Sequence, residues 1–317
     1  MIYSEVDVFG FGHCCIDYLC VLDPYPEKGK KGEVIESLVI GGGPVPTALR
    51  TIVKLGGTAR FCGKVGGDRD GEQVIRELGE AGVDVRPMIT DPTETTARAY
   101  IWIDPHKASR TVALDRTRFS WMKENQLQDE LPVKCKILLT DGRATEASLK
   151  GLHLAKKAGI TTVLDCGANR NRLEEMLPLV DYAIVSLEFG DSINIKSNTC
   201  EKKQSNCREE SMQKASEITH FLRENGARVA IVTLGETGSF YSTERQENLI
   251  PGFKVKAYDT TGAGDVFHGS FIYGLLQNWS IDSSIRFANA AAALSCRVLS
   301  GSRGIPDLTE IQTFIRN

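Results

Sequence analysis

The stretch Asp259-Thr-Thr-Gly-Ala-Gly-Asp-Val-Phe-His-Gly-Ser270 (DTTGAGDVFHGS) places three residues with little or no side chain directly before an acid. The run from Val266 to Leu276 is apolar and has no early breaker, which predicts a helix. Gly262, Ala263 and Gly264 leave their backbone open to close approach. The loop therefore delivers several amide N–H groups onto a helix N-terminus, and such an end binds anions.

Asp265 follows in the first turn of this predicted helix. A plain helix cap would explain an aspartate there, but a cap does not require Gly-Ala-Gly before it. The loop lacks the Gly-x-x-x-x-Gly-Lys-Ser/Thr pattern of a P-loop, and GAGDVF lacks the third glycine of the dinucleotide fingerprint. We therefore interpret Asp265 as a base that takes a proton beside a phosphate held by the preceding amides.

Outward from this loop, strand-like and helical patterns alternate through most of the 317 residues. Continuous Val/Ile/Leu character at 137–139, 183–185 and 229–232 is typical of strands buried on both faces of a parallel sheet. The predicted strands are 6–12, 59–65, 136–141, 161–167, 182–186 and 229–235. The predicted helices are 46–55, 70–82, 145–158, 211–225, 266–277 and 282–298. This alternation predicts a layered α/β sandwich with a mainly parallel sheet.

Two segments break the alternation. Residues 33–40 are predicted as β structure, and so are the runs TTARAYIWID (95–104) and RTVAL (110–114), which the turn PHKAS joins. They predict a small sheet that stands off the main one.

Composition excludes several classes of protein. A formal net charge of −3 argues against a general nucleic-acid or anionic-membrane binder, and no apolar run approaches the length of a membrane span. The N-terminal MIYSEVDVFG lacks a basic region followed by an apolar core, so we expect no signal peptide. Nine scattered cysteines without a Cys-x-x-Cys pair indicate reduced thiols, so we expect a cytoplasmic protein.

Four motifs carry a resemblance to a known family. DTTGAGDVFHGSF resembles the C-terminal signature of the ribokinase-like (pfkB) carbohydrate kinases, and GGGPVPTALRTIVKLGGTARFCGKVGGDRDG (41–71) resembles the N-terminal one. VTLGETGSFY (232–241) and FANAAAALS (287–295) resemble the family's nucleotide turn and the helix that closes over the adenine. Order and spacing agree from residue 6 to about 306. RTVALDR (110–116) and DGR (141–143) look most like the ketohexokinase branch.

The resemblance implies a single domain over 1–317 with the ribokinase-like three-layer sandwich, a mainly parallel central sheet and a small β lid from about 14–40 and 93–118. It implies an ATP-dependent kinase that transfers the γ-phosphoryl group to a hydroxyl of a small carbohydrate such as ribose, fructose or another ketose, with Mg²⁺ and, in some members, K⁺. It further implies a homodimer formed through the lid.

The same resemblance assigns roles to individual residues. Asp265 matches the catalytic base, and Gly262, Ala263 and Gly264 match the anion hole for the transferring phosphoryl group. The residues that match or lie near the sugar site are Asp17, Gly41, Gly42, Arg110, Asp141 and Arg143; of these, Arg110 and Arg143 can meet a sugar hydroxyl or a phosphate already on the substrate. Those on the nucleotide side are Glu188, Thr233, Gly235, Gly238 and Asn289. Asp259 and Thr261 match part of a K⁺ loop that is completed from Ser295 to Gly304.

The sequence also departs from the family pattern. Pro46 occupies the place of a sugar-binding Asn and offers neither a side-chain donor nor an N–H. Glu188 lacks the Asn of the Asn-x-x-Glu element that organises Mg²⁺, and Ser270 is a small change within the signature. We predict that His268 serves packing. Two alternatives stay open: a nucleoside kinase of the same fold, with Trp102 or Phe119 as a platform for the base, and a catalytically silent ligand sensor.

Overall fold

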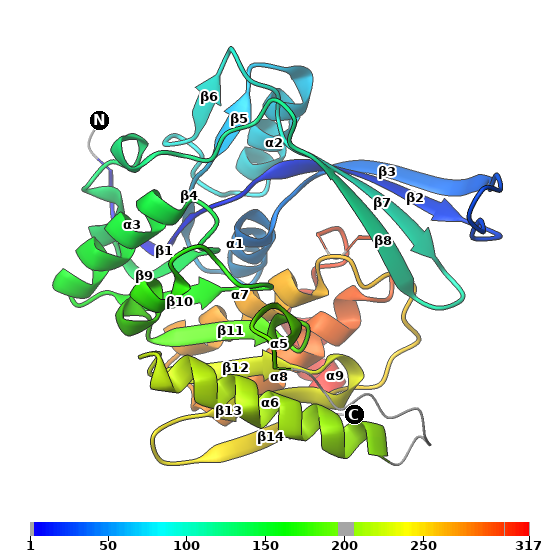
Figure 1. Ribbon diagram of the computed structural model, residues 1–317. Coiled ribbons are helices and arrows are strands. Elements are labelled where there is room, and N and C mark those ends of the chain that lie inside the picture. The colour runs from blue at the N-terminus through cyan, green and yellow to red at the C-terminus, as the bar shows by residue number, and fades with distance from the viewer. Residues whose placement is uncertain (1–2, 196–205, 301, 317) are drawn as a thin grey trace.

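A computed structural model describes residues 3–195, 206–300 and 302–316. Its centre is an eight-stranded sheet in the order β14-β13-β12-β11-β10-β9-β1-β4 (Figure 1). The strands are β1 (Val6–Phe11), β4 (Ala59–Cys62), β9 (Cys135–Thr140), β10 (Thr161–Asp165), β11 (Tyr182–Ser186), β12 (Val229–Thr233), β13 (Gly238–Ser242) and β14 (Glu247–Pro251). The first six are parallel, and the β13–β14 hairpin adds an antiparallel edge.

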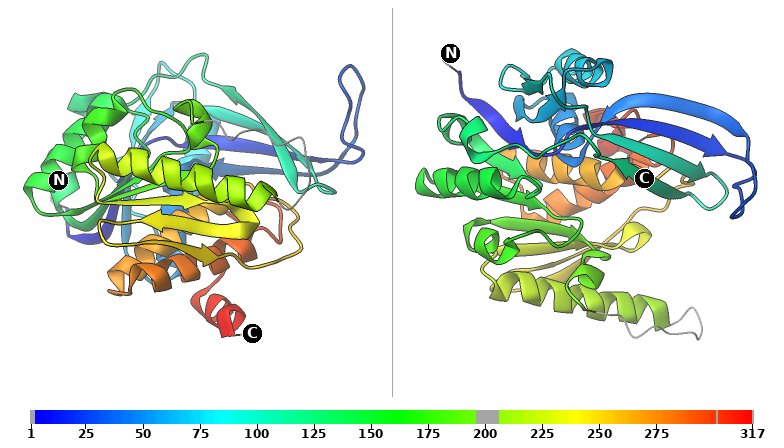
Figure 2. Two further views of the ribbon diagram at one scale, coloured as in Figure 1. Left: turned by 60° about the horizontal axis from the view of Figure 1, so that its bottom comes forward. Right: turned by 45° about the horizontal axis from the view of Figure 1, so that its top comes forward.

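Helices cover both faces of this sheet (Figure 2). On one face lie α3 (Thr145–Lys157), α4 (Leu173–Met176), α5 (Phe189–Ser192) and α6 (Asn206–Glu224). On the other lie α1 (Pro44–Lys54), α7 (Ala263–Leu276) and α8 (Ile281–Ser295). Beside these, α2 (Arg69–Glu80) packs against β2 and β3, and α9 (Leu308–Arg316) packs on α8. Short 3₁₀ turns occupy Glu124–Gln126, Leu131–Val133, Leu177–Leu179 and Gly235–Thr237.

The two-residue period of the strands divides the core into two layers. Leu138 and Leu164 pack toward α3, whereas Ile137, Leu139 and Val163 pack toward α1 and α7. Both sets are buried, which is why these strands have continuous rather than alternating apolar character. The predicted fold class, an α/β sandwich with a mainly parallel sheet and a separate small sheet, is confirmed.

Helix α7 lies in the middle of its layer, between α1 and α8. Its residues from Val266 to Gly274 are all buried, as expected for a helix that is apolar nearly all round. At Gly269 a Cβ atom would lie 2.4 Å from the carbonyl oxygen of Ala48, so this glycine permits the close crossing of α1 and α7. The sheet and both neighbouring helices therefore fix the N-terminus of α7.

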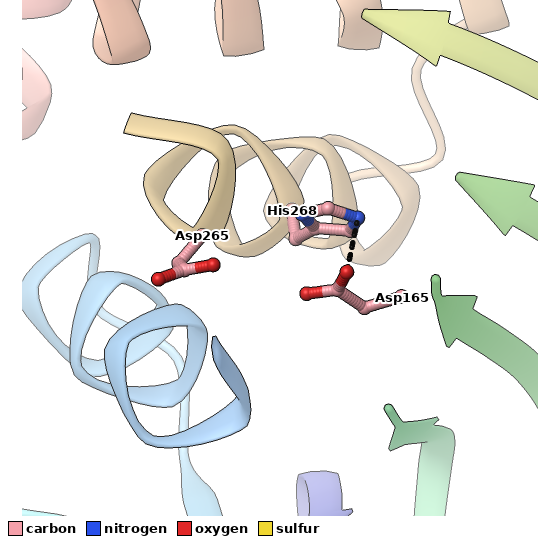
Figure 3. Close-up of side chains that lie close together, drawn as sticks. All are labelled: Asp165, Asp265 and His268. Atoms are coloured by element: carbon pink, nitrogen blue, oxygen red, sulfur yellow. Dashed lines mark ion pairs between the residues drawn. The ribbon is translucent and has the colours of Figure 1, made fainter. Parts of the chain in front are cut away.

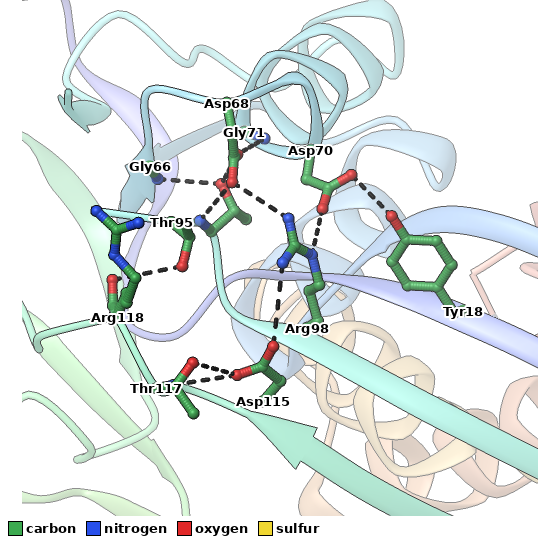
Figure 4. A network of polar contacts seen from close by, with 11 residues as sticks. Tyr18, Gly66, Asp68, Asp70, Gly71, Thr95, Arg98, Asp115, Thr117 and Arg118 are labelled. Atoms are coloured by element: carbon green, nitrogen blue, oxygen red, sulfur yellow. Dashed lines mark hydrogen bonds and ion pairs between the residues drawn. The ribbon is translucent and has the colours of Figure 1, made fainter. Parts of the chain in front are cut away.

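The small sheet has the order β3-β2-β7-β8 and projects from one side of the body (Figure 1). It is built from β2 (Cys15–Leu22), β3 (Val34–Gly42), β7 (Arg98–Asp104) and β8 (Ser109–Asp115); a further pair, β5 (Lys64–Gly66) and β6 (Ile89–Asp91), lies near α2. Charged contacts at its base join it to α2 (Figure 4). The Arg98 guanidinium donates to Asp70 at 2.6 Å, and the Tyr18 hydroxyl donates to the same carboxylate at 2.9 Å.

Some elements differ from the sequence prediction. The β13–β14 hairpin and α9 were not predicted, because 238–251 contains no long apolar run and α9 has only nine residues. Helix α6 begins at Asn206 rather than 211, within a polar stretch whose first part lies outside the described residues. Helix α7 begins at Ala263, so the small residues before Asp265 are part of the first turn. Among the described helices, none has the length and apolarity needed to cross a membrane.

Candidate active site

The carboxyl ends of the parallel strands bring distant segments to one edge of the sheet. Phe11 of β1 is paired with Thr140 of β9, and Asp165 ends the neighbouring strand β10. The segments that follow these strands therefore lie side by side. In open α/β sheets this edge is where ligands bind.

The N-terminus of α7 presents free amides at this edge. Gly262 caps the helix with φ 81°, a left-handed conformation that favours glycine. The first turn leaves the N–H groups of Gly264 and Asp265 without a backbone acceptor in the described chain. A Cβ atom at Gly264 would meet nothing within 4 Å, and Gly264 lines a cavity, so open space adjoins this residue. The geometry matches an anion-binding helix end.

Asp265, Asp165 and His268 lie together beside that helix end (Figure 3). One carboxylate oxygen of each aspartate and one ring nitrogen of His268 all lie within 4.8 Å of one another. Nδ1 of His268 is 2.6 Å from the carbonyl oxygen of Gly264 and must carry a proton, because a carbonyl oxygen only accepts. Nε2 then lies 3.5 Å from Asp165. Burial, and next the charges of Asp165 and Asp17, raise the pKa of Asp265 well above its usual range.

A cavity of about 250 Å³ opens next to the same helix end. Thr233, Gly235, Gly238 and Asn289 line it together with Ala263 and Gly264 and with small or apolar residues of 253–257 and α8. Gly238 is required in its turn, because φ is 113° and a Cβ would lie 2.1 Å from the carbonyl oxygen of Ile250. The Asn289 amide is used internally: it accepts from Ser239 and donates to two main-chain carbonyls. Asn289 therefore shapes the wall.

Asp17 of β2 and the glycines Gly41 and Gly42, which end β3, lie together at the base of the small sheet, the lid. A Cβ atom on Gly42 would be 2.0 Å from the Asp17 carboxylate, so only glycine fits beside it. The main-chain N–H of Gly41 donates to Glu77, which also pairs with the buried Arg50. Burial raises the pKa of Asp17 to about 6, although the Cys15 thiol and the Arg50 charge favour its ionised form. The Asp17 charge also raises the pKa of Asp265, so the two carboxylates lie within electrostatic range of each other.

Asp141 and Arg143 stand after β9, against the segment that follows β1. The Asp141 carboxylate is fully buried and accepts from the main-chain N–H of His13 at 2.8 Å and of Arg143 at 3.0 Å. A Cβ atom on Gly12 would lie 2.7 Å from this carboxylate. Asp141 therefore ties the ends of β1 and β9 together, and the Arg143 side chain projects from this junction.

The lid, which is the small sheet β3-β2-β7-β8, reaches the 258–260 loop through Arg110. Its Nη1 donates to the Thr260 hydroxyl at 2.7 Å, and the Tyr258 hydroxyl donates to Glu36 of β3 at 2.8 Å. Arg110 also lowers the pKa of Asp265 by its charge, against the larger effect of burial. The lid thus closes against the 258–260 loop.

Other predicted residues lie at the margin of this assembly. Glu188 follows β11 at the same edge but is exposed and does not line the cavity. The Asp259 carboxylate accepts from Thr261 and from the N–H of Ser300, which joins the two segments predicted for a cation; Gly301 in the second segment lies outside the described residues. Pro46 is buried in the first turn of α1, where a missing N–H costs nothing. Ser270 is buried, and its hydroxyl has no partner among the described residues.

Sequence reasoning did not identify several residues that the structure brings to the site. They are His13, Arg50, Arg116, Asp165 and Arg170. Arg50 lies within the N-terminal motif (41–71) and Arg116 ends RTVALDR (110–116), but neither motif gave these residues a role; His13, Asp165 and Arg170 lie outside the quoted motifs. The position of Asp165 at the end of a predicted buried strand was the one usable signal.

Comparisons with known proteins agree with this architecture. The family model described as pfkB family carbohydrate kinase matches residues 7–308. A ribokinase of Haemophilus influenzae is 28% identical over 87% of each chain, and a 5-dehydro-2-deoxygluconokinase of Bacillus licheniformis is 25% identical over 98% of this chain and 96% of its own. A crystal structure of a putative ribokinase from Agrobacterium tumefaciens superposes with a TM-score of 0.84 at 24% identity, covering 99% and 98% of the two chains.

The expected likeness to the ketohexokinase branch finds no support among these relatives, which are ribokinases and 5-dehydro-2-deoxygluconokinases. The family itself is clear, because its model spans nearly the whole chain. The chain belongs to the pfkB family of carbohydrate kinases, phosphotransferases that act on an alcohol group.

Proposed function

We propose that this protein uses ATP to phosphorylate a hydroxyl of a small sugar, with Asp265 as the base. One observation carries the proposal: free amides at the start of α7 adjoin a carboxylate whose pKa lies well above its usual range. A base works best when its pKa approaches the working pH. Two curated relatives are named as sugar kinases, which supports the same reaction class.

ATP fits the donor side of this site. We place its adenine in the small-residue cavity bounded by Thr233, Gly238 and Asn289, and its γ-phosphoryl group before the amides of Gly264 and Asp265. A solved relative of 20% identity is described as a complex with ATP and Mg²⁺. Mg²⁺, when bound, would neutralise negative charge that develops in the transfer. Glu188, exposed at the end of β11, is the carboxylate we assign to it.

The acceptor hydroxyl lies between Asp17 and Asp265. Asp265 takes its proton, and the oxygen forms a bond to the γ-phosphorus while the bond to the bridging oxygen breaks and ADP leaves with the electron pair. The amides of Gly264 and Asp265 stabilise charge on the phosphoryl oxygens. Asp17 accepts hydrogen bonds from sugar hydroxyls, and Gly41 and Gly42 allow the sugar to approach the backbone. Closure of the lid excludes water.

Replacement of the base tests this proposal. Asp265→Asn is expected to lower turnover of the best sugar by about 10³-fold, within the usual range for general base catalysis, and to leave ATP affinity nearly unchanged. ADP release and calorimetry measure the two effects. The control is Asp282→Asn, which alters an acid in the first turn of neighbouring helix α8. Near-normal turnover of Asp265→Asn would refute the assignment.

We propose a K⁺ site from Asp259, Thr261 and the segment around Ser300. The support is that Asp259 is buried and joins both segments, and carboxylate and carbonyl oxygens suit a hard cation. Turnover in KCl should exceed that in NaCl or choline chloride at equal ionic strength. Equal rates in all three salts would contradict the site.

We propose that the chain acts as one kinase domain and pairs with a second copy through the lid. Among the described residues, the exposed large apolar side chains gather on the four-stranded sheet; they are Val34, Ile35, Val39, Tyr100, Trp102, Val112 and Leu114, with only Val133 and Val298 elsewhere. Apolar patches of this kind mark interfaces. Light scattering should give a dimer that Trp102→Asp weakens. The scattered cysteines favour the cytoplasm as its compartment.

The nucleoside alternative receives little support, because Trp102 lies on the exposed side of β7 and Phe119 packs against His13 and Trp121. The silent-sensor alternative does not explain free amides beside a base. A panel of ketoses, pentoses and nucleosides with ATP separates all three functions.

A further inference from the structure

Three arginines from three separate segments converge on one place in the proposed acceptor site. Arg143 follows β9, and its Nε lies 3.9 Å from Asp141. Arg170 follows β10, and its Nε donates to the main-chain oxygen of Asp141 at 2.8 Å. Arg116 follows β8 of the lid and places its guanidinium 5.1 Å from the ring centre of Trp121.

His13 joins these groups. Its main-chain N–H donates to the Asp141 carboxylate, and its ring lies 5.3 Å from Trp121. Burial, and then the charges of Arg116, Arg143 and Arg170, hold the pKa of His13 well below its usual range. Burial and the charge of Arg143 likewise lower the pKa of Arg116. The side chains of this group, His13 and the three arginines, therefore lie close enough to shift one another's pKa.

The charges of this group do not balance. Asp141 is the carboxylate in contact with it, and burial raises even its pKa. Three guanidinium groups against the carboxylates of Asp141 and, at longer range, Asp265 leave an excess of positive charge in a partly buried place. Like charges brought together without counter-ions are destabilising, so the arrangement indicates a function other than stability.

Polar atoms of the group also lack partners. Nε of Arg116, Nε of Arg143 and Nδ1 of His13 are buried and make no hydrogen bond within the described part of the chain. His13 is only 5% exposed. A buried donor without a partner costs free energy unless a ligand satisfies it. Arg170, by contrast, directs two of its donors to main-chain oxygens and so holds the group in place.

The position of the group relates it to the acceptor rather than to ATP. Arg143 lowers the pKa of Asp265 by its charge, so the two groups lie within electrostatic range of each other. The other members lie after β1, β8 and β10, away from the donor cavity, whose lining includes none of the four side chains. An anion held here sits at the end of the acceptor opposite the anion hole.

We propose that Arg116, Arg143 and His13 bind an anionic group of the acceptor, so that the sugar which this kinase phosphorylates already carries a carboxylate or a phosphate. Planar guanidinium groups bind both anions through paired hydrogen bonds, and the neutral His13 ring adds one more polar contact. The inference rests on the proposed sugar kinase function and names its class of substrate. The relative of Bacillus licheniformis is named for an acid acceptor, which is consistent with it.

Paired ligands test this inference. Equilibrium binding to the intact protein is measured by calorimetry for ketohexoses, the matching hexonates and keto-acids, and the ketohexose monophosphates, and turnover with ATP is measured on the same panel. At least one anionic sugar should bind and react about 10²-fold better than its neutral counterpart, the factor expected for charge-assisted hydrogen bonds. The arms distinguish carboxylate from phosphate.

Variants assign the effect to the group. Arg143→Gln and Arg116→Gln should each weaken binding of the preferred anion by about 10-fold or more, a larger loss than for the matching neutral sugar, while Arg143→Lys should recover part of the loss. Arg118→Gln is the matched control, because Arg118 is an exposed arginine two residues along the same segment (Figure 4). Melting temperatures verify that each variant folds.

The outcomes separate this inference from the proposed function. If neutral sugars bind and react as well as every anionic one, or if Arg143→Gln and Arg116→Gln weaken binding of both kinds equally, the anion subsite is wrong and the kinase assignment stands. If the anions bind as predicted but no sugar reacts, the subsite stands and the kinase assignment falls.

Discussion

The two ends of the site are built in opposite ways. The proposed donor end is a small-residue cavity and a helix start whose main-chain amides have no backbone acceptor in the described chain. The acceptor end consists of charged side chains, among them Asp17, Asp141 and Arg143, that come from separate strands and loops. Main-chain groups can bind a ligand that all members of a family share. A ligand that differs among members requires side chains, because these can change by substitution.

Gly264→Ala gives the strongest test of this contrast. Its Cβ would enter the open space beside Gly264, where no atom from outside its own helix turn lies within 4 Å. Turnover should fall by about 10²-fold, the typical effect of impairing an anion hole, while the free energy of unfolding rises by up to about 1 kcal/mol because alanine favours the helix. Steady-state kinetics and thermal melting measure both.

The control for Gly264→Ala is Gly79→Ala, an exposed position in α2 where the new Cβ meets Val85 at 3.7 Å. It should stabilise the protein similarly and leave turnover unchanged. Full activity of Gly264→Ala would show that no phosphate lies before these amides.

The acceptor end should contain a carboxylate that destabilises the fold. The folded pKa of Asp17 is about 6, above its unfolded value of 3.8, so ionisation at neutral pH works against the folded state. The contribution of Asp17 to the free energy of unfolding is therefore highest below pH 4, where Asp17 is protonated in both states, and it falls as the pH rises from about 4 through 6. Asp17→Asn should therefore gain up to about 3 kcal/mol at pH 7 relative to pH 4, and it should bind sugar poorly.

Denaturant unfolding of both forms between pH 4 and pH 8 measures this difference. Asp181→Asn is a suitable comparison, since Asp181 hydrogen-bonds to Thr162 at the opposite end of the sheet. A difference between Asp17→Asn and the parent that does not vary with pH would contradict the raised pKa.

These contrasts also explain what the sequence could predict. The donor end could be predicted because residues 259–270 and 287–295 are each contiguous in the sequence. Neither helix capping nor packing requires three adjacent small residues before an acid, so this pattern indicated a function. The central strands could also be predicted, because burial on both faces of the sheet leaves continuous apolar runs in the sequence. The partners of Asp141 could not, because His13 and Arg170 become its neighbours only when the ends of β1, β9 and β10 align.

Gly42→Ala should affect the acceptor end and spare the donor end, with a smaller effect on activity than Gly264→Ala. The new Cβ would lie 2.0 Å from the Asp17 carboxylate and must displace it. We expect the KM of the acceptor to rise by about 10-fold, as for loss of one hydrogen bond to a charged group, while the KM of ATP changes by less than about twofold. A parallel rise of both values would mean that the lid root serves the whole site.

The smallest expected effect lies where the two ends meet. Arg110 of the lid donates to Thr260, and Thr260 also lines the donor cavity. Thr260→Val keeps the shape and removes the acceptor oxygen, so it should raise the KM of the sugar a few-fold through weaker lid closure. Arg110→Ala should do the same, and a double-mutant cycle should show a coupling of about 1 kcal/mol.

Arg110 has a second role that Thr260 lacks, and the pH profile reveals it. The Arg110 charge opposes the effect of burial on the pKa of Asp265, so Arg110→Ala should raise that pKa further and move the acid limb of kcat/KM to higher pH. Thr260→Val should leave the acid limb in place, because it removes no charge. If both variants moved the limb equally, the lid would act on the base through closure, since exclusion of water raises the pKa of a carboxylate without any contribution from the guanidinium charge.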